Sequence, residues 1–225
     1  MLPNGKVLAL GGSLNDEDTA TASLNADSYD PGSTTSRHRP EQNVYPRLYH
    51  SVALLLPDAS VWVAGGNPTR GTYEQHVEIY KPAYLFRFDW CCTLCAPSIG
   101  SVTGTISYGT PFTGADARRG SDFAGSPGAL GITDHAFDQE QRLVGLSFTT
   151  SAGALTVTAP PNGNIAPPGY YMLFLLNTNG VPSVAKFVKL GTGAPPPPPA
   201  IAFVQANTGP ATIQSLEFIG GCGIR

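Results

Sequence analysis

A phenol and an imidazole stand side by side where an apolar segment of the chain begins. Tyr49 and His50 follow Arg47-Leu48 and directly precede the apolar run that starts at Ser51. A phenolate oxygen and an imidazole nitrogen are ligand types that suit cupric ion. An isolated Tyr-His pair more often just starts a strand. The pair is therefore a candidate copper site that needs support from its surroundings.

The position of this pair relative to the strand decides whether both side chains can reach one ion. Neighbouring residues within a strand point to opposite faces, so Tyr49 and His50 can share a metal only outside regular strand structure. The sequence predicts that the strand begins at Ser51. Both residues should then lie at its rim.

An internal repeat surrounds the pair. Leu2–Gly12 aligns without gaps on Leu56–Gly66, and Asp27–Pro31 corresponds to Glu78–Pro82. Each unit is a turn, an apolar strand, a di-glycine, a loop and a second strand. A period of about fifty residues with Gly-Gly after a strand is typical of kelch propeller blades, although a plain β-meander is the alternative. Two units cannot close a ring of roughly four to eight blades, so they predict the end of a longer propeller.

Several motifs in order resemble the copper-radical oxidases of the galactose oxidase and glyoxal oxidase family. The run Arg47–Ser51 is similar to the start of a late blade in that family. His135–Leu146 is similar to the loop of its C-terminal domain that enters the propeller channel. Ala159–Phe174 and Gly180–Ser183 are similar to later parts of the same immunoglobulin-like, early-set domain.

The resemblance implies a copper ion held by Tyr49 as axial ligand and by His50 and His135 as equatorial ligands. It also implies that Tyr49 takes the proton of a small alcohol, aldehyde or sugar substrate, which is oxidised with dioxygen to give hydrogen peroxide. The family's radical tyrosine, joined to a cysteine, lies in upstream blades, and no residue here matches it. We therefore expect part of an oxidase that is inactive alone. Relatives are usually exported, so the resemblance implies a secreted or extracytoplasmic protein. The start of this chain lacks a signal peptide pattern, and we expect upstream sequence to be missing.

The chain should be all-β throughout. Hydrophobic residues make up 41% and charged residues 13%, with 26 Gly and 21 Pro, which is typical of a turn-rich β protein. We expect a partial kelch propeller followed by an immunoglobulin-like β-sandwich, a Pro-rich linker and a truncated tail. The expected bounds of these four parts are 1–85, 97–190, 191–200 and 201–225. Strands are expected at Ile99–Tyr108, Leu143–Phe148, Leu155–Ala159, Tyr170–Asn177 and Val184–Leu190.

Charge and hydropathy exclude two classes of partner. A net charge of −3 offers no basic footprint for nucleic acid. The longest apolar run, Tyr170–Leu176, is much shorter than the roughly 20 residues of a membrane span. His38 and His76 lie in polar surroundings and are expected to be solvated. Asp138, Gln141 and Arg142 either fix the His135 loop or are ordinary turn residues.

Three short segments depart from the family pattern: Thr34–Asn43, Arg87–Ala96 and Gly114–Asp134. The last has no apolar alternation, and we expect it to be poorly ordered. Because strong family pattern flanks each segment, local reading-frame errors are our hypothesis for all three. That hypothesis also explains the crowding of Cys91, Cys92 and Cys95, which, with Cys222, are interpreted as incidental thiols because zinc-site spacing is missing.

Two other classes of function stay open. The chain could be a non-catalytic kelch and sandwich module that binds carbohydrate or protein, in which case it should have no affinity for metal. It could also be a defective product that does not fold. An upstream cysteine and tyrosine in the neighbouring gene sequence would favour the enzyme.

Overall fold

The secondary structure is almost entirely β. The only helical elements among the described residues are two single 3-10 turns, η1 (Thr19–Thr21) and η2 (Ala83–Leu85), which confirms the all-β fold class; none of the described helical segments is long and apolar enough to span a membrane. The fold is taken from a computed structural model, which describes residues 1–15, 17–86, 96–115, 124–129, 133–134, 137–138, 141–151 and 154–191. These all belong to one compact unit, Met1–Thr192.

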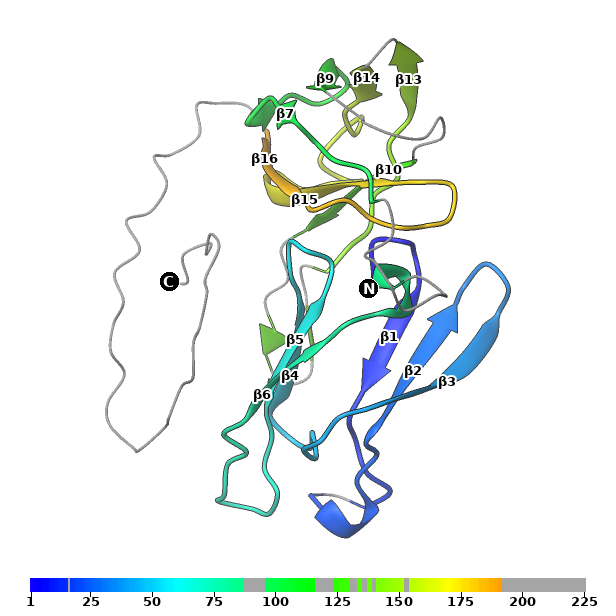
Figure 1. The fold of residues 1–225 in the computed structure, drawn as a ribbon. Coiled ribbons are helices and arrows are strands. Elements are labelled where there is room, and N and C mark those ends of the chain that lie inside the picture. Colours follow the sequence, from blue (N-terminus) through cyan, green and yellow to red (C-terminus); the bar gives the residue numbers. More distant parts are fainter. Residues whose placement is uncertain are drawn as a thin grey trace. The chain divides into compact units, whose positions relative to one another are not determined.

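Two three-stranded antiparallel sheets form the N-terminal part (Figure 1). The first sheet has the order β1-β2-β3 and the second the order β4-β5-β6. Their bounds are β1 Val7–Leu10, β2 Asn25–Asp30, β3 Thr35–Gln42, β4 Ser51–Leu55, β5 Val61–Gly65 and β6 Val77–Tyr80. Each is a meander of neighbouring strands, as expected for consecutive blades of a partial kelch propeller.

The repeat read from the sequence is reproduced in the strand register. Val7 of β1 lies opposite Tyr29 of β2, and Val61 of β5 lies opposite Tyr80 of β6. The sequence alignment makes these two pairs equivalent, so β1 corresponds to β5 and β2 to β6. The two units therefore share one backbone arrangement.

The turns before β1 and β5 are equivalent too. The Leu2 amide donates to the Lys6 carbonyl at 2.8 Å, and the Leu56 amide donates to the Ser60 carbonyl at 2.8 Å. Residues at the third position after each leucine have positive φ, +82° at Gly5 and +65° at Ala59. Such a φ is easy for glycine and strained for alanine, and Ala59 is held by complete burial.

Two four-stranded sheets form the sandwich, with the orders β10-β15-β16-β8 and β13-β14-β9-β7. Their strands are β7 Ser101–Val102, β8 Thr105–Ile106, β9 Pro111–Ala115, β10 Ala124–Ala129, β13 Phe148–Ser151, β14 Ala154–Thr158, β15 Gly169–Leu176 and β16 Lys186–Leu190. Leu155 and Val157 of β14 are buried, whereas Thr156 and Thr158 are exposed. The alternation predicted for this strand is confirmed.

Strand β15 is buried on both faces. Tyr171, Leu173 and Leu175 pack into the core of the sandwich. The alternate residues Met172, Phe174 and Leu176 pack into a second cluster with Ala59, Leu55 and Tyr84. Because successive side chains point to opposite faces, β15 joins the sandwich to the sheet of β4, β5 and β6.

Two of the segments that depart from the family pattern form strands. Thr34–Asn43 contains β3, which pairs with β2 through a register shift at Asn25/Ala26. Within Gly114–Asp134, where we expected poor order, residues 124–129 form β10, which pairs with β15 along its whole length. Backbone pairing with β15 thus forms a strand that has no apolar pattern of its own, while the expected poor order of the segment stays a prediction.

One expected strand needs a smaller correction, and other expectations concern residues that the structure does not describe. The strand expected at Leu143–Phe148 begins only at Phe148, as β13. Residues 116–123 and 130–132, the segment 87–95 with its three cysteines, and residues 192–225 with Cys222, the linker and the tail lie outside the described residues.

Tyr84 gives the second cluster a predicted pH dependence. Its hydroxyl donates to the Ala59 carbonyl at 2.6 Å, and burial raises the pKa of Tyr84 well above 10. The unfolded chain therefore releases this proton at lower pH than the folded chain, and stability should fall as pH rises above about 10. Urea unfolding between pH 8 and 11 should show a shallower fall in Tyr84→Phe than in the parent; equal falls would contradict this.

Candidate metal centre

Tyr49 and His50 occupy the two central positions of a tight turn. The Ser51 amide donates to the Leu48 carbonyl at 3.0 Å, which closes the turn. His50 has φ of +64°, the left-handed conformation that a type II turn requires at its third residue. Strand β4 begins directly afterwards at Ser51, where the sequence predicts it.

The turn brings the two aromatic rings together on one side. Their centroids are 3.9 Å apart and their planes differ by 30°. Tyr49 is 50% exposed, and His50 is exposed as well. In a regular strand the same two side chains would point to opposite faces. The turn thus removes the geometric obstacle to one ion shared by a phenol and an imidazole, and this donor set suits Cu(II).

Arg47 anchors this turn and is 0% exposed. Its Nε donates to Oε2 of Glu78 at 3.0 Å, and its Nη2 donates to the same oxygen. Its Nη1 donates to the carbonyls of Gly65 at 3.1 Å and His76 at 2.9 Å. One guanidinium therefore ties the approach to the Tyr49-His50 turn to the end of β5 and the start of β6.

Glu78 uses its second oxygen on the same approach. Oε1 of Glu78 accepts a hydrogen bond from the Val44 amide at 2.6 Å. The carboxylate thus holds both Arg47 and the chain three residues before it. A buried ion pair is stable only when the remaining donors and acceptors of its two side chains also have partners. Arg47 donates four hydrogen bonds here, two to Glu78 and two to backbone carbonyls.

His76 has a structural role next to this anchor. Its ring stacks on Tyr45 with centroids 3.7 Å apart and planes 3° apart, and its Nδ1 contacts Oε1 of Glu74 at 2.5 Å. Burial raises the pKa of Glu74, but hydrogen bonds from the His76 amide and ring outweigh it, so this pKa lies below its usual value. His76 thus has a carboxylate partner; His38 lies in β3, and its side chain is outside the described part of the structure.

The di-glycines let neighbouring backbones approach the anchor. A Cβ at Gly11 would lie 2.3 Å from the Arg47 carbonyl oxygen, and one at Gly65 would lie 2.8 Å from the His50 carbonyl oxygen. The Gly12 amide donates to the Arg47 carbonyl at 2.8 Å. The first di-glycine thus holds the backbone of Arg47, and the second lies against the turn.

Gly11→Ala should destabilise the chain more than Gly12→Ala. Both positions have positive φ, +78° and +88°, so each alanine costs about 1–2 kcal/mol in backbone strain. Only at Gly11 does the new methyl also meet backbone, because nothing lies within 4 Å at Gly12. Chemical denaturation of the two variants checks this, and equal losses of stability would contradict the close approach.

The third proposed ligand follows a strand that lies beside β4. Thr133–Asp134 (β11) and Phe137–Asp138 (β12) pair as a two-stranded hairpin, and β11 neighbours β4. His135, which follows β11 in sequence, is outside the described residues. The structure therefore brings Tyr49 and His50 together and places the strand preceding His135 next to the strand that follows them.

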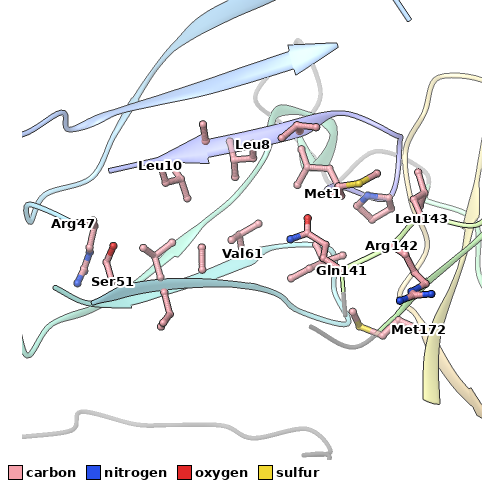
Figure 2. Close-up of a pocket in the computed structure, with 18 of the residues that line it drawn as sticks. Met1, Leu8, Leu10, Arg47, Ser51, Val61, Gln141, Arg142, Leu143 and Met172 are labelled. Carbon is pink, nitrogen blue, oxygen red and sulfur yellow. The ribbon is translucent and has the colours of Figure 1, made fainter. Parts of the chain in front are cut away.

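Side chains after the hairpin line the same cavity as Arg47 and Ser51 but lie toward its other end (Figure 2). Gln141 and Arg142 line a cavity between β1 and β4, together with Arg47 and Ser51 (Figure 2). Among the described residues, no three His, Cys, Asp or Glu side chains gather closely enough to hold a metal ion.

Sequence reasoning missed the ion pair of Arg47 and Glu78. Glu78 is the one charged residue in the short strand Val77–Tyr80, and a charge in an apolar strand signals a buried partner. In the sequence, Arg47 stands out only as the first residue of the Arg47–Ser51 motif. Its role follows from contacts between residues 31 positions apart, which sequence spacing does not reveal.

Comparison with known proteins finds one matching domain family and several similar oxidases. Residues 96–190 match the galactose oxidase-like, early-set domain family. The chain is 33% identical over 179 residues to an aldehyde oxidase of Vitis pseudoreticulata, covering 64% of this chain and 30% of that protein. It is 29% identical over 199 residues to the galactose oxidase of Gibberella zeae, covering 84% of this chain and 28% of that protein.

A solved structure shows the same fold. It is a fungal alcohol oxidase of the AA5 family in complex with copper, with a TM-score of 0.78 and 29% identity over 85% of this chain and 41% of that one. The chain thus spans about 30% of the curated relatives just described. We conclude that residues 96–190 are a galactose oxidase-like early-set domain and that the chain is a partial homologue of the galactose oxidase and glyoxal oxidase copper-radical oxidases.

Proposed function

We propose that this chain is part of a copper-radical oxidase that converts a primary alcohol to an aldehyde, or a hydrated aldehyde to an acid, while dioxygen is reduced to hydrogen peroxide. The observation that carries the proposal is the Tyr49-His50 turn, which sets a phenol and an imidazole side by side. The anchor at Arg47 and the similarity to a copper-containing alcohol oxidase support it.

Tyr49, His50 and His135 would hold the ion. Copper, when bound, supplies the one-electron chemistry that dioxygen reduction needs. Tyr49 is half exposed, so its phenolate oxygen can accept the hydroxyl proton of a bound alcohol. The turn keeps the ring of Tyr49 stacked on the imidazole of His50. Arg47 orients the turn through its backbone and contacts neither substrate nor metal in this scheme.

The site as proposed is incomplete in this chain alone. The resemblance places the radical-forming tyrosine and its cysteine partner in blades with no counterpart here. The substrate loses two electrons in each oxidation, and Cu(II) would accept only one of them, so the second electron would have to go to such a group. We therefore propose that the 225-residue chain binds copper weakly and does not turn over. We also propose that the protein is exported from the cytoplasm, because the family it resembles is usually exported.

Calorimetric titration with Cu(II) tests the ligand set. We expect weak binding by the parent chain, loss of binding in His50→Ala/His135→Ala, and retention in His38→Ala/His76→Ala, which removes the same number of imidazoles. Equal loss in both double variants would overturn the assignment. Circular dichroism of each variant must match the parent.

A peroxide assay tests the second half of the proposal. With primary alcohols and aldehydes, the copper-loaded chain should produce no hydrogen peroxide above a copper-free blank. Sustained peroxide production that depends on Tyr49 would contradict the claim that the chain is incomplete. If the chain binds no copper but does bind glycans on an array, the result would favour the non-catalytic module.

A further inference from the structure

Three Asn-Gly pairs occur in the sequence, and the structure holds their glycine amides differently. The pairs are Asn4-Gly5, Asn162-Gly163 and Asn179-Gly180. In such a pair, the backbone nitrogen of the glycine can attack the side-chain amide of the asparagine, because glycine has no side chain to hinder the approach and its backbone is the least restricted. Each pair is therefore a candidate site of self-modification by loss of ammonia.

The glycine amides of two pairs are held in turns. The Gly5 amide donates to the Leu2 carbonyl at 3.0 Å, and the Gly180 amide donates to the Asn177 carbonyl at 2.8 Å. Before either nitrogen can attack, this hydrogen bond must break and the turn must open. Among the described residues, none accepts a hydrogen bond from the Gly163 amide. Of the three glycine nitrogens, that of Gly163 can therefore react without a change in the fold.

Two backbone amides hold the side-chain oxygen of Asn162. The Asn164 amide donates to Oδ1 of Asn162 at 3.0 Å, and the Ile165 amide donates to the same oxygen at 3.3 Å. When a nucleophile adds to the side-chain carbon, this oxygen gains negative charge, which two fixed N–H donors stabilise. At Asn4 the described structure shows one such donor, the Lys6 amide at 3.3 Å. The local fold thus favours attack at Asn162.

We propose that Asn162 deamidates spontaneously in the folded chain. The backbone nitrogen of Gly163 bonds to Cγ of Asn162, its proton passes through solvent to the side-chain nitrogen, and the C–N bond of the side chain breaks to release ammonia. Asn162 is exposed, so water can reach the cyclic imide that results. One water molecule opens this imide to an aspartyl or isoaspartyl residue at position 162. No electron is transferred, and the inference is independent of copper.

The isoaspartyl product should loosen the loop between β14 and β15, because it adds one carbon atom to the backbone. The Ala166 amide donates to the Asn162 carbonyl at 3.3 Å, and Ala166 is 0% exposed. The Ala166 carbonyl in turn accepts a hydrogen bond from the Tyr108 hydroxyl at 2.8 Å. A longer backbone at position 162 displaces this packed residue. The modified chain should therefore be less stable than the parent.

Peptide mapping by mass spectrometry tests the proposal on the 225-residue chain. Samples are incubated folded and in urea, and conversion is followed at all three Asn-Gly pairs. In urea the three rates should be similar, because the reacting dipeptide is the same. In the folded chain, Asn162 should convert faster than Asn4 and Asn179 by about fivefold or more, the factor that one hydrogen bond is worth. Folding that slows all three pairs equally would overturn the proposal.

Gly163→Ala is the matched control variant. A Cβ at this position would lie 3.5 Å from the Tyr108 hydroxyl, which is an ordinary van der Waals contact, so the loop should accept the methyl group while attack by the nitrogen is hindered. After incubation the variant should keep the unfolding midpoint of fresh protein, whereas the midpoint of the parent should fall as position 162 converts. Equal conversion at position 162 in both chains, or conversion of the parent without loss of stability, would contradict the proposal.

Discussion

Glu78→Ala should destabilise the chain by about 3–5 kcal/mol, because it leaves the guanidinium of Arg47 buried without its charge partner. Arg47 is 0% exposed and gives two of its hydrogen bonds to Glu78. The substitution also removes the acceptor of the Val44 amide. Urea unfolding followed by tryptophan fluorescence measures the loss, because Trp62 of β5 is next to Val63, the strand partner of Glu78.

Two variants separate this effect from a general loss of charge. Asp30→Ala removes the partner of Lys6 in an ion pair of 3.2 Å at the surface, which should cost far less stability than Glu78→Ala because water screens the pair. The double variant Arg47→Met/Glu78→Leu should recover much of the stability, since apolar replacement of a buried pair is often neutral. A Glu78→Ala loss no larger than that of Asp30→Ala would contradict the anchor.

Phe174→Ala should cost about 3–5 kcal/mol, as expected for removal of a fully buried aromatic side chain. Phe174 is 0% exposed and packs with Ala59, Met172 and Tyr84 between β15 and the second sheet. The cavity left by the lost ring would weaken the packing that joins the core of the sandwich to the sheet of β4, β5 and β6 through β15. Differential scanning calorimetry should show a lower and broader transition.

Phe86→Ala is the matched control. Phe86 is 51% exposed, so the same chemical change should shift the transition only slightly. Under the proposed ligand set, Phe174→Ala should also weaken copper binding, because the proposed ligand His135 belongs to the early-set domain of residues 96–190. Equal effects of the two substitutions would show that the cluster does not join the parts.

The fold could be predicted from the sequence where local patterns repeat. The Leu-Pro-Asn-Gly and Leu-Pro-Asp-Ala turns read from the sequence have the same hydrogen bonds in both repeats. The strand start at Ser51 was also predictable, because apolar residues follow it without interruption. Alternation identified β14, whose two faces meet core and solvent. These features depend on neighbours in the sequence.

Features that depend on distant partners were missed. Strand β10 has the sequence Ala-Gly-Ser-Pro-Gly-Ala, which predicts no strand, yet it pairs with β15. The left-handed φ of His50 is also unusual for a residue other than glycine. It is imposed by the anchor of Arg47 and the close backbone of Gly65. Tertiary contacts override local preference at these places.

Electron paramagnetic resonance of the chain loaded with one equivalent of Cu(II) tests the central claim most directly. We expect nitrogen hyperfine lines from two imidazoles in the parent, from one imidazole in His135→Ala, and no change in His76→Ala. In the optical spectrum of the same sample, Tyr49→Phe should remove the absorption of the copper-bound phenolate. The number of nitrogen ligands in the resonance spectrum should not change. An unchanged spectrum in both His50→Ala and His135→Ala would contradict the proposal that one copper ion joins the turn before β4 to the loop after β11.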